Sequence, residues 1–178
     1  DLEATVLLRL LRYSGLRIEE AVGRRRTVYD PYEGRMVQVA DRGLRVKDVD
    51  LTHLVITVRG KGARENQMFL DRETAHLLGN LIGSLKRRDP EAPIFQTKEG
   101  APKGTKWAHR LFARLVERAG TRRITPHMIR HTFATRALEE GADLRAVQRF
   151  LRHEKLDTTL VYADFVRGSK LRAQYDAH

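Results

Sequence analysis

The chain has 178 residues, and its 41% hydrophobic and 32% charged content fits a globular domain with a core, not a disordered chain. Its net charge of +11 comes from 34 Lys and Arg against 23 Asp and Glu, and it favours a polyanionic partner such as nucleic acid. Since there is no cysteine, disulfides, thiolate chemistry and cysteine-based zinc sites are excluded.

The first 44 residues predict two helices followed by an irregular stretch. Apolar residues spaced by four predict a helix over 2–13, which Ser14-Gly15 ends. A second, short helix is expected to start within 16–21. Residues 23–44 contain turn signals such as Asp30-Pro31, and we expect them to be irregular.

A β-hairpin is predicted in the middle of the chain. Leu54, Ile56 and Val58 alternate with their neighbours, as the inward face of a strand does. A glycine-rich turn then leads into a second strand that runs to Leu70. Lys61 is therefore expected at or near the tip of this hairpin.

The second half of the chain predicts mostly helix. Thr125 is a suitable N-cap, with Pro126 at the first helical position, and Asp143 suits the cap of a later helix. The predicted helices run over 72–88, through Trp107 to Gly120, from Pro126 to Gly141, from Leu144 to Leu151 and over 157–165. The predicted fold class is therefore mainly α with a small antiparallel β-sheet, an α+β fold.

The stretch PHMIRHT combines three groups that suit an anion. In a helix beginning near Pro126, His127, Arg130 and His131 share one face, which we expect to point away from Ile129 and Phe133. The helix start adds unpaired N–H groups and a partial positive charge, so the face suits a phosphate. The plainer interpretation is a polar helix start in which His131 packs on the core, and we assign His131 to structure.

Four further residues occur in stretches that belong with this one. Arg17 lies in SGLRIEEA, Lys61 in RGKGAR, and His153 precedes Tyr162 by nine residues in HEKLDTTLVY. With HMIRH between them, these stretches resemble the catalytic domain of the tyrosine recombinase family, which includes phage integrases and Xer-like proteins. The resemblance covers essentially all 178 residues and implies the tyrosine recombinase catalytic-domain fold.

The resemblance implies a site for DNA strand transfer. Arg17 and Arg130 would clamp the phosphate oxygens and stabilise the charge of the transition state without a metal. Tyr162 would attack and form a 3′-phosphotyrosyl link, with His127 as proton acceptor and Lys61 as the acid for the 5′ oxygen. The implied catalytic set is Arg17, Lys61, His127, Arg130, His153 and Tyr162.

The resemblance also implies the partners. We expect double-stranded DNA, a homo-oligomer that is a tetramer on DNA, no cofactor, no metal, no small-molecule substrate and no membrane. No apolar run approaches the ~20 residues that span a bilayer, and no signal segment is visible, so we expect a cytoplasmic protein. The chain opens with Asp1, as expected of a piece of a longer protein, and the family's N-terminal core-binding domain is missing. We therefore expect weak DNA binding with steep salt dependence.

The sequence also departs from the family pattern. Residues 24–44 look like an insertion, either a basic flap that contacts DNA or a tolerated surface hairpin. Arg152 stands where the family usually has glycine, which puts the placement of His153 in doubt. We otherwise expect one catalytic domain over 1–178 with a C-terminal tail at 164–178, which could dock on a neighbouring copy.

Three other functions stay open from the residues. Taken singly, Arg17 fits a surface charge, Lys61 fits the solvated tip of a hairpin, and Tyr162 fits a half-buried side chain of the core. Residues 133–151 suit a non-catalytic helix-turn-helix that binds DNA. A type IB topoisomerase would share the chemistry but relax supercoils. A metal-dependent nuclease fits least, because no carboxylate cluster suited to Mg²⁺ is visible. The target sequence, the biological task and whether Tyr162 acts in its own protomer are not specified by the sequence.

Overall fold

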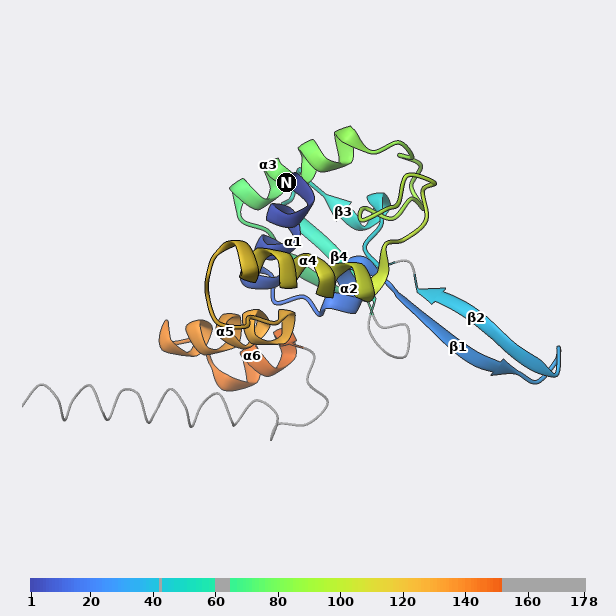
Figure 1. Cartoon of the computed structure of the whole chain (residues 1–178). Coiled ribbons are helices and arrows are strands. Elements are labelled where there is room, and N and C mark those ends of the chain that lie inside the picture. The colour runs from blue at the N-terminus through green and yellow to red at the C-terminus, as the bar shows by residue number, and fades with distance from the viewer. Residues whose placement is uncertain (42, 60–64, 152–178) are drawn as a thin grey trace, which may run out of the picture.

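The structure of the protein is a computed structural model that describes residues 1–41, 43–59 and 65–151 (Figure 1). It is mainly helical, as predicted, but it contains two small antiparallel sheets where one was expected. In chain order the described elements are α1 (Leu2–Tyr13), α2 (Ile18–Val22), β1 (Arg24–Asp30), β2 (Arg35–Asp41), the 3-10 helix η1 (Val46–Asp48), β3 (Val49–Asp50), β4 (Val55–Arg59), β5 (Glu65–Phe69), α3 (Arg72–Ser84), α4 (Gly104–Arg118), α5 (Pro126–Glu139) and α6 (Leu144–Leu151).

Helix α1 lies at the centre of the core and matches the predicted helix over 2–13. Its Leu7, Leu10 and Leu11 are completely buried. The helix packs against both α3 and α5, so a single apolar helix joins the two halves of the chain (Figure 1). An ion pair of 2.7 Å between Arg9 and Asp71, the N-cap of α3, fixes one of these contacts.

The predicted hairpin forms strands β4 and β5 of a three-stranded sheet. The strand order is β3-β4-β5, and all neighbours are antiparallel. Ile56 pairs with Met68, and both are buried with Val58 against the core. The alternation that predicted β4 is thus the inner face of this sheet. Residues 60–64, which include Lys61, lie outside the described residues.

Helices α5 and α6 begin where their capping residues predicted. The Thr125 hydroxyl accepts a hydrogen bond from the Met128 N–H at 3.3 Å, and Pro126 occupies the first turn. Gly141 follows the end of α5 with a φ of +94°, and the Asp143 carboxylate accepts from the Arg145 N–H at 2.9 Å. These local signals were sufficient to place both helices. The predicted helix over 157–165 lies outside the described residues.

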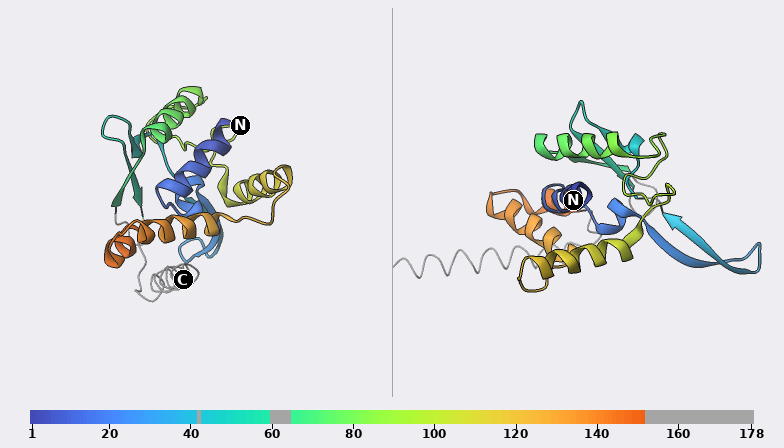
Figure 2. Two further views of the ribbon diagram at one scale, coloured as in Figure 1. Left: turned by 90° about the vertical axis from the view of Figure 1, so that its left-hand side faces the viewer. Right: turned by 45° about the horizontal axis from the view of Figure 1, so that its top comes forward.

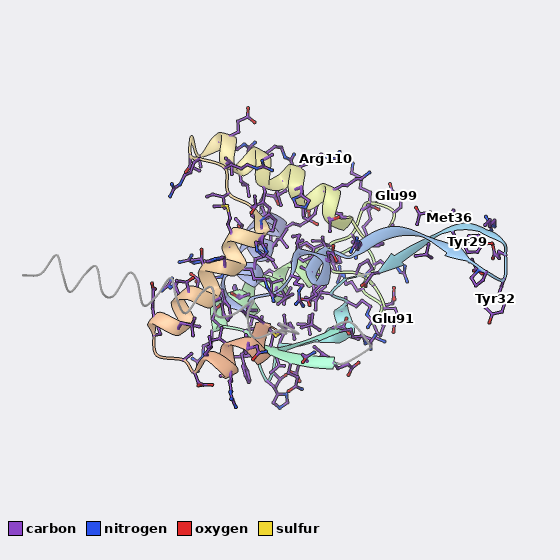
Figure 3. All side chains as sticks on the ribbon, turned by 90° about the horizontal axis from the view of Figure 1, so that it is seen from below. Tyr29, Tyr32, Met36, Glu91, Glu99 and Arg110 are labelled. Atoms are coloured by element: carbon purple, nitrogen blue, oxygen red, sulfur yellow. The ribbon has the colours of Figure 1, made fainter. Side chains whose placement is uncertain are left out.

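The expectation that 23–44 is irregular is wrong. Strands β1 and β2 pair along their whole length, from Arg24 opposite Asp41 to Asp30 opposite Arg35. Together with their turn they form a two-stranded ribbon, here called the arm, which projects from the body (Figures 1 and 2). At its tip the Asp30 carboxylate accepts hydrogen bonds from the N–H groups of Tyr32 and Glu33. The stretch takes the form of a hairpin, which agrees with both interpretations of this insertion; Figure 3 labels Tyr32 at its tip.

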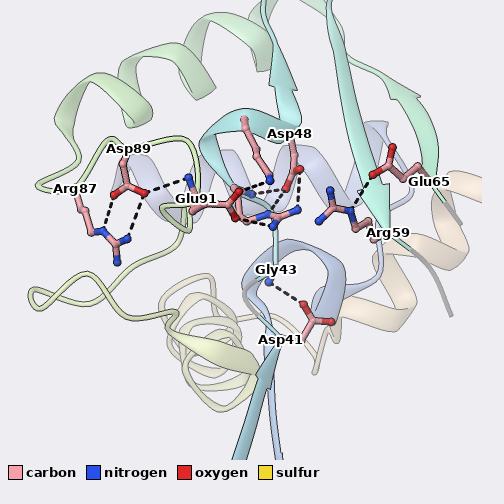
Figure 4. Close-up of polar contacts among 10 residues, drawn as sticks. Asp41, Gly43, Asp48, Arg59, Glu65, Arg87, Asp89 and Glu91 are labelled. Carbon is pink, nitrogen blue, oxygen red and sulfur yellow. Dashed lines mark hydrogen bonds and ion pairs between the residues drawn. The ribbon is translucent and has the colours of Figure 1, made fainter. Parts of the chain in front are cut away.

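The arm joins the body at a close crossing of backbone. Gly43 has a φ of +67°, and its N–H donates to the Asp41 carboxylate at 3.3 Å (Figure 4). A Cβ at Gly43 would lie 2.3 Å from the Gly23 nitrogen and 2.6 Å from the Ala21 oxygen. Since these are backbone atoms, no side-chain rotation can relieve the overlap.

We therefore expect Gly43→Ala to lower the free energy of unfolding by about 2–3 kcal/mol in urea titrations. Gly34→Ala in the arm's turn is the matched control. Gly34 has a φ of +62°, but no heavy atom lies within 4 Å of the Cβ that alanine would add. Only the backbone cost of roughly 1–2 kcal/mol applies there. Equal losses in the two variants would contradict the tight crossing at Gly43.

Candidate functional site

Arg130 is a buried arginine at the junction of three segments. It is only 4% exposed. One terminal guanidinium nitrogen donates to the carbonyl of Gly15, between α1 and α2, and the other donates to the carbonyl of Leu151, the last residue of α6. A single guanidinium on α5 therefore fixes the α1–α2 connection and the end of α6 to one another.

This junction brings predicted site residues from distant parts of the sequence close together. Arg17 follows Gly15 by two residues, so the Cα atoms of these residues lie within about 7 Å of each other. Gly15 and Arg130 are 115 positions apart in the sequence. Arg17 and Arg130 are thus neighbours in the fold, which the sequence spacing alone does not require.

Arg17 is held at the start of α2 by a buried carboxylate. The Arg17 N–H donates to one oxygen of Glu20 at 2.7 Å, and its guanidinium donates to the other oxygen at 3.1 Å. The Glu20 side chain is 8% exposed, whereas that of Arg17 is 41% exposed. The carboxylate thus holds the arginine from its buried side and leaves part of the guanidinium facing solvent.

The two histidines of α5 lie in different surroundings. His127 is exposed in the first turn, and His131 is half-buried one turn later. Burial lowers the pKa of His131, and the nearby charge of His127 lowers it further. The ring of His131 also contacts the Thr135 hydroxyl at 3.4 Å. A neutral, packed His131 agrees with the structural assignment made from the sequence.

The predicted outward face of α5 needs a correction. His127 and His131 lie near one another, as their spacing predicted. Arg130, however, is buried and bonded to backbone carbonyls, because residues that are remote in sequence close over it.

Three of the six predicted site residues lie outside the described residues. They are Lys61, His153 and Tyr162, and their roles stay predictions. Strand β4 leads up to Lys61 and ends at Arg59, whose guanidinium pairs with Glu65 at the start of β5 at 2.9 Å. Leu151, bonded to Arg130, precedes His153 by two positions.

Two acidic residues of the region drawn in Figure 4, Asp48 and Glu91, are engaged in ion pairs with Arg45. Arg45 bonds to Asp48 at 2.9 Å and to Glu91 at 2.8 Å, and its pKa is raised chiefly by the hydrogen bond to Asp48. Asp48, Asp41 and Glu20 line a cavity of about 240 Å³. Within the described ranges, no three His, Asp or Glu side chains are grouped to hold a metal ion. The described helices include none with the length and hydrophobicity needed to cross a membrane.

Helix α4 has a basic face that was not predicted from the sequence. Lys106, Arg110 and Arg114 are exposed at a spacing of four, and none of the three has an ion pair within the described part of the chain. They line a groove of about 940 Å³ together with Trp107 of the same helix and Thr27 of β1. The i, i+4, i+8 spacing of these three cations could have predicted this face, since it places them in one row on a helix, here called the basic row.

Comparison with known proteins gives one consistent family. The sequence profile described as the phage integrase family matches residues 41–166, so the Arg17 stretch precedes the matched part. The tyrosine recombinase XerC of Lactobacillus leichmannii is 35% identical over 150 residues, which are 81% of this chain and 50% of that protein. The corresponding protein of Bacillus subtilis strain 168 is 31% identical over 179 residues, covering 97% of this chain and 52% of its own length.

Solved structures agree with this result. The crystal structure of XerA recombinase matches with a TM-score of 0.74 and 29% identity, over 100% of this chain and 57% of that one. A post-cleavage complex of XerH recombinase with palindromic difH substrate matches with a TM-score of 0.73 over 97% of this chain and 45% of that one; at 23% identity it shows the fold alone. The chain spans about half the length of the relatives that it matches.

Proposed function

The chain belongs to the phage integrase family and is a tyrosine recombinase catalytic domain, and from this premise we propose that it breaks and rejoins duplex DNA through Tyr162. The phenol oxygen attacks a backbone phosphorus, forms a 3′-phosphotyrosyl bond and expels a 5′ hydroxyl. A 5′ hydroxyl from another strand then attacks that bond and releases the tyrosine. Each step exchanges one ester for another, so no ATP is consumed.

The convergence at Arg130 is the observation that supports this proposal most. Arg130 bonds to the carbonyl two residues before Arg17 and to the carbonyl two residues before His153. These residues come from three of the four stretches that suggested the site. Stretches that carried only unrelated surface charges would not be expected to be hydrogen-bonded to the same buried guanidinium.

The two arginines supply the charge that the reaction requires. A phosphodiester is anionic, and attack on it adds further charge to its non-bridging oxygens. Guanidinium groups stay protonated and match two oxygens at once, so Arg17 and Arg130 suit this charge. Removal of one such donor commonly slows a reaction by about a hundredfold or more.

The remaining roles concern protons. A free phenol has a pKa of about 10, so Tyr162 must lose a proton as it attacks, and His127 is the proposed acceptor. His127 is exposed at the start of α5, where an incoming phosphate can reach it. The departing 5′ oxygen takes a proton from Lys61, which lies between β4 and β5 in the sequence. His153 is proposed to assist at the phosphate.

The proposed partner is double-stranded DNA, on which we propose that the protein forms a homo-oligomer. The net charge of +11 favours a polyanion. The basic row on α4 gives this charge a place, because exposed cations that form no ion pair with the residues the structure describes can replace the counterions of phosphates. The proposal for the oligomer is a tetramer, as the family resemblance implies.

The test is the covalent intermediate itself. The 178-residue chain is incubated in EDTA with a pool of nicked duplexes of randomised sequence, whose short cleaved strand dissociates and prevents religation. We expect a protein–DNA band that survives denaturing electrophoresis. No adduct across the whole pool would contradict the proposal. Sequencing the trapped DNA then separates a site-selective recombinase from a topoisomerase, which would trap sites without preference.

A further inference from the structure

The arm has two chemically different faces. Because side chains alternate along a strand, Thr27 and Tyr29 of β1 share a face, and Met36 joins it as the cross-strand partner of Tyr29. Tyr29 is 62% exposed and Met36 58% exposed. The acidic Asp30 lies on the opposite face with Val28. The first face thus carries an exposed aromatic ring and an exposed thioether.

The face of the arm that carries Thr27 and Tyr29 continues the groove that the basic row of α4 lines. Thr27 lines the groove together with Lys106, Arg110 and Arg114, and β1 is in contact with α4. Tyr29 follows about 7 Å farther along the strand on the same side. Figure 3 labels Arg110 on α4, and Tyr29 and Met36 on the arm. A long ligand bound along the basic row can therefore extend directly onto Tyr29 and Met36.

We propose that the arm is a second DNA-binding element, which extends the contact of α4 along the flanking duplex. This inference rests on the proposed DNA substrate. A two-stranded ribbon is of a size that fits the major groove of B-DNA. Tyrosine hydroxyls donate to phosphate oxygens, while the ring and a thioether can cover the sugar. The family profile begins its match at residue 41, so it assigns nothing to these arm residues.

Charge favours DNA over a second copy of the chain as the occupant. A second copy carries the same net charge of +11, and the face lies next to a row of cations. Duplex DNA carries about one negative charge per 1.7 Å of its axis, so the same surroundings attract it. The exposed apolar side chains alone would suit a protein surface, and the experiment separates these two cases.

The experiment measures binding to a fluorescent duplex of about 40 base pairs, roughly four helical turns, over a range of salt. We expect the double variant Tyr29→Thr/Met36→Thr to bind about fivefold more weakly at every salt concentration, with an unchanged salt slope because no charge is lost. Threonine keeps the strand propensity of the ribbon. The matched control Val28→Thr/Val37→Thr removes a cross-strand pair on the opposite face and should bind as wild type does.

A triple variant of the basic row provides the second comparison. Lys106→Ala/Arg110→Ala/Arg114→Ala should reduce the salt slope by about 3, since each phosphate contact contributes about 0.9. If this variant loses affinity while the Tyr29/Met36 variant binds as wild type does, the arm inference is wrong and the DNA substrate stands. If the wild-type chain does not bind the duplex, both proposals are wrong.

A photo-crosslink tests the contact directly and does not depend on the stability of the arm. A benzophenone side chain at position 36 should crosslink to the duplex, whereas one at position 37, on the opposite face, should not. Crosslinking from position 36 to a second copy of the chain, or equal crosslinking from both positions, would overturn the inference.

Discussion

Replacing Tyr162 by phenylalanine is expected to abolish the covalent DNA adduct completely, while duplex affinity stays within about twofold of wild type. The substitution removes one oxygen atom, which is the proposed nucleophile. Binding depends on cations such as those of α4, which the substitution leaves in place. Denaturing electrophoresis after incubation with the nicked duplex pool measures the first quantity, and fluorescence anisotropy measures the second.

Tyr175→Phe is the matched control, because Tyr175 follows in the same C-terminal segment and loses the same hydroxyl. It should form the adduct at the wild-type rate. An adduct that persists in Tyr162→Phe and disappears in Tyr175→Phe would identify Tyr175, not Tyr162, as the nucleophile. Persistence in both would mean that the linkage is not to either tyrosine, and the proposed chemistry would then fail.

Local signals predicted the helices well. Thr125 and Asp143 mark helix starts through hydrogen bonds from residues only two or three positions away, and Pro126 suits the first turn through its fixed φ, so the sequence contains everything that these signals need. The spacing of the leucines of α1 likewise predicts a buried helix. Strands β4 and β5 could be predicted because one face of their sheet is buried, so buried and more exposed residues alternate along the strands.

The arm was missed because none of its side chains whose burial the structure describes is fully buried. A strand is recognised by alternation when one face is covered, and β1 and β2 project as a ribbon with Tyr29 and Met36 exposed. Only the turn signals and the β-forming residues remained, and these also fit an irregular loop. Its proposed contact with DNA depends on the neighbouring α4, some 80 positions away, which no local pattern reports.

The burial of Arg130 was missed for a related reason. The spacing of HxxRH fixes which residues share a face of α5, but it does not report what covers that face. The covering groups are the carbonyls of Gly15 and Leu151, at sequence separations of 115 and 21. The resemblance to a family identified Arg130 as important, and only the fold reveals that it also joins segments.

A non-catalytic helix-turn-helix accounts for less of the structure. Such a module would present α6 to the major groove, and Val147 and Leu151 are buried against α5, as in any packed helix pair. It gives no reason for a buried arginine to fix the end of α6 beside the stretch that carries Arg17. Membership in the tyrosine recombinase family gives such a reason, since the site must be assembled from separate segments.

Arg130→Lys is expected to slow adduct formation by about a hundredfold or more while it changes duplex affinity by no more than about threefold. Lysine keeps the positive charge, so long-range attraction to DNA persists. It cannot reproduce the planar fork, which presents donors in two fixed directions. Single-turnover rates at saturating protein and anisotropy titrations give the two quantities, and equal losses in both would contradict the assigned role.

The same substitution should also lower the free energy of unfolding by about 1–3 kcal/mol, because one ammonium group cannot satisfy both buried carbonyls of Gly15 and Leu151. Rates must therefore be compared at a temperature where circular dichroism shows both proteins folded. Arg136→Lys is the control, since Arg136 lies on α5 as well but is exposed, with only a 3.8 Å contact to Glu140. It should change neither quantity. A catalytic loss in Arg130→Lys without any loss of stability would show that the two carbonyl bonds are dispensable, and the buried guanidinium would then act on the phosphate alone.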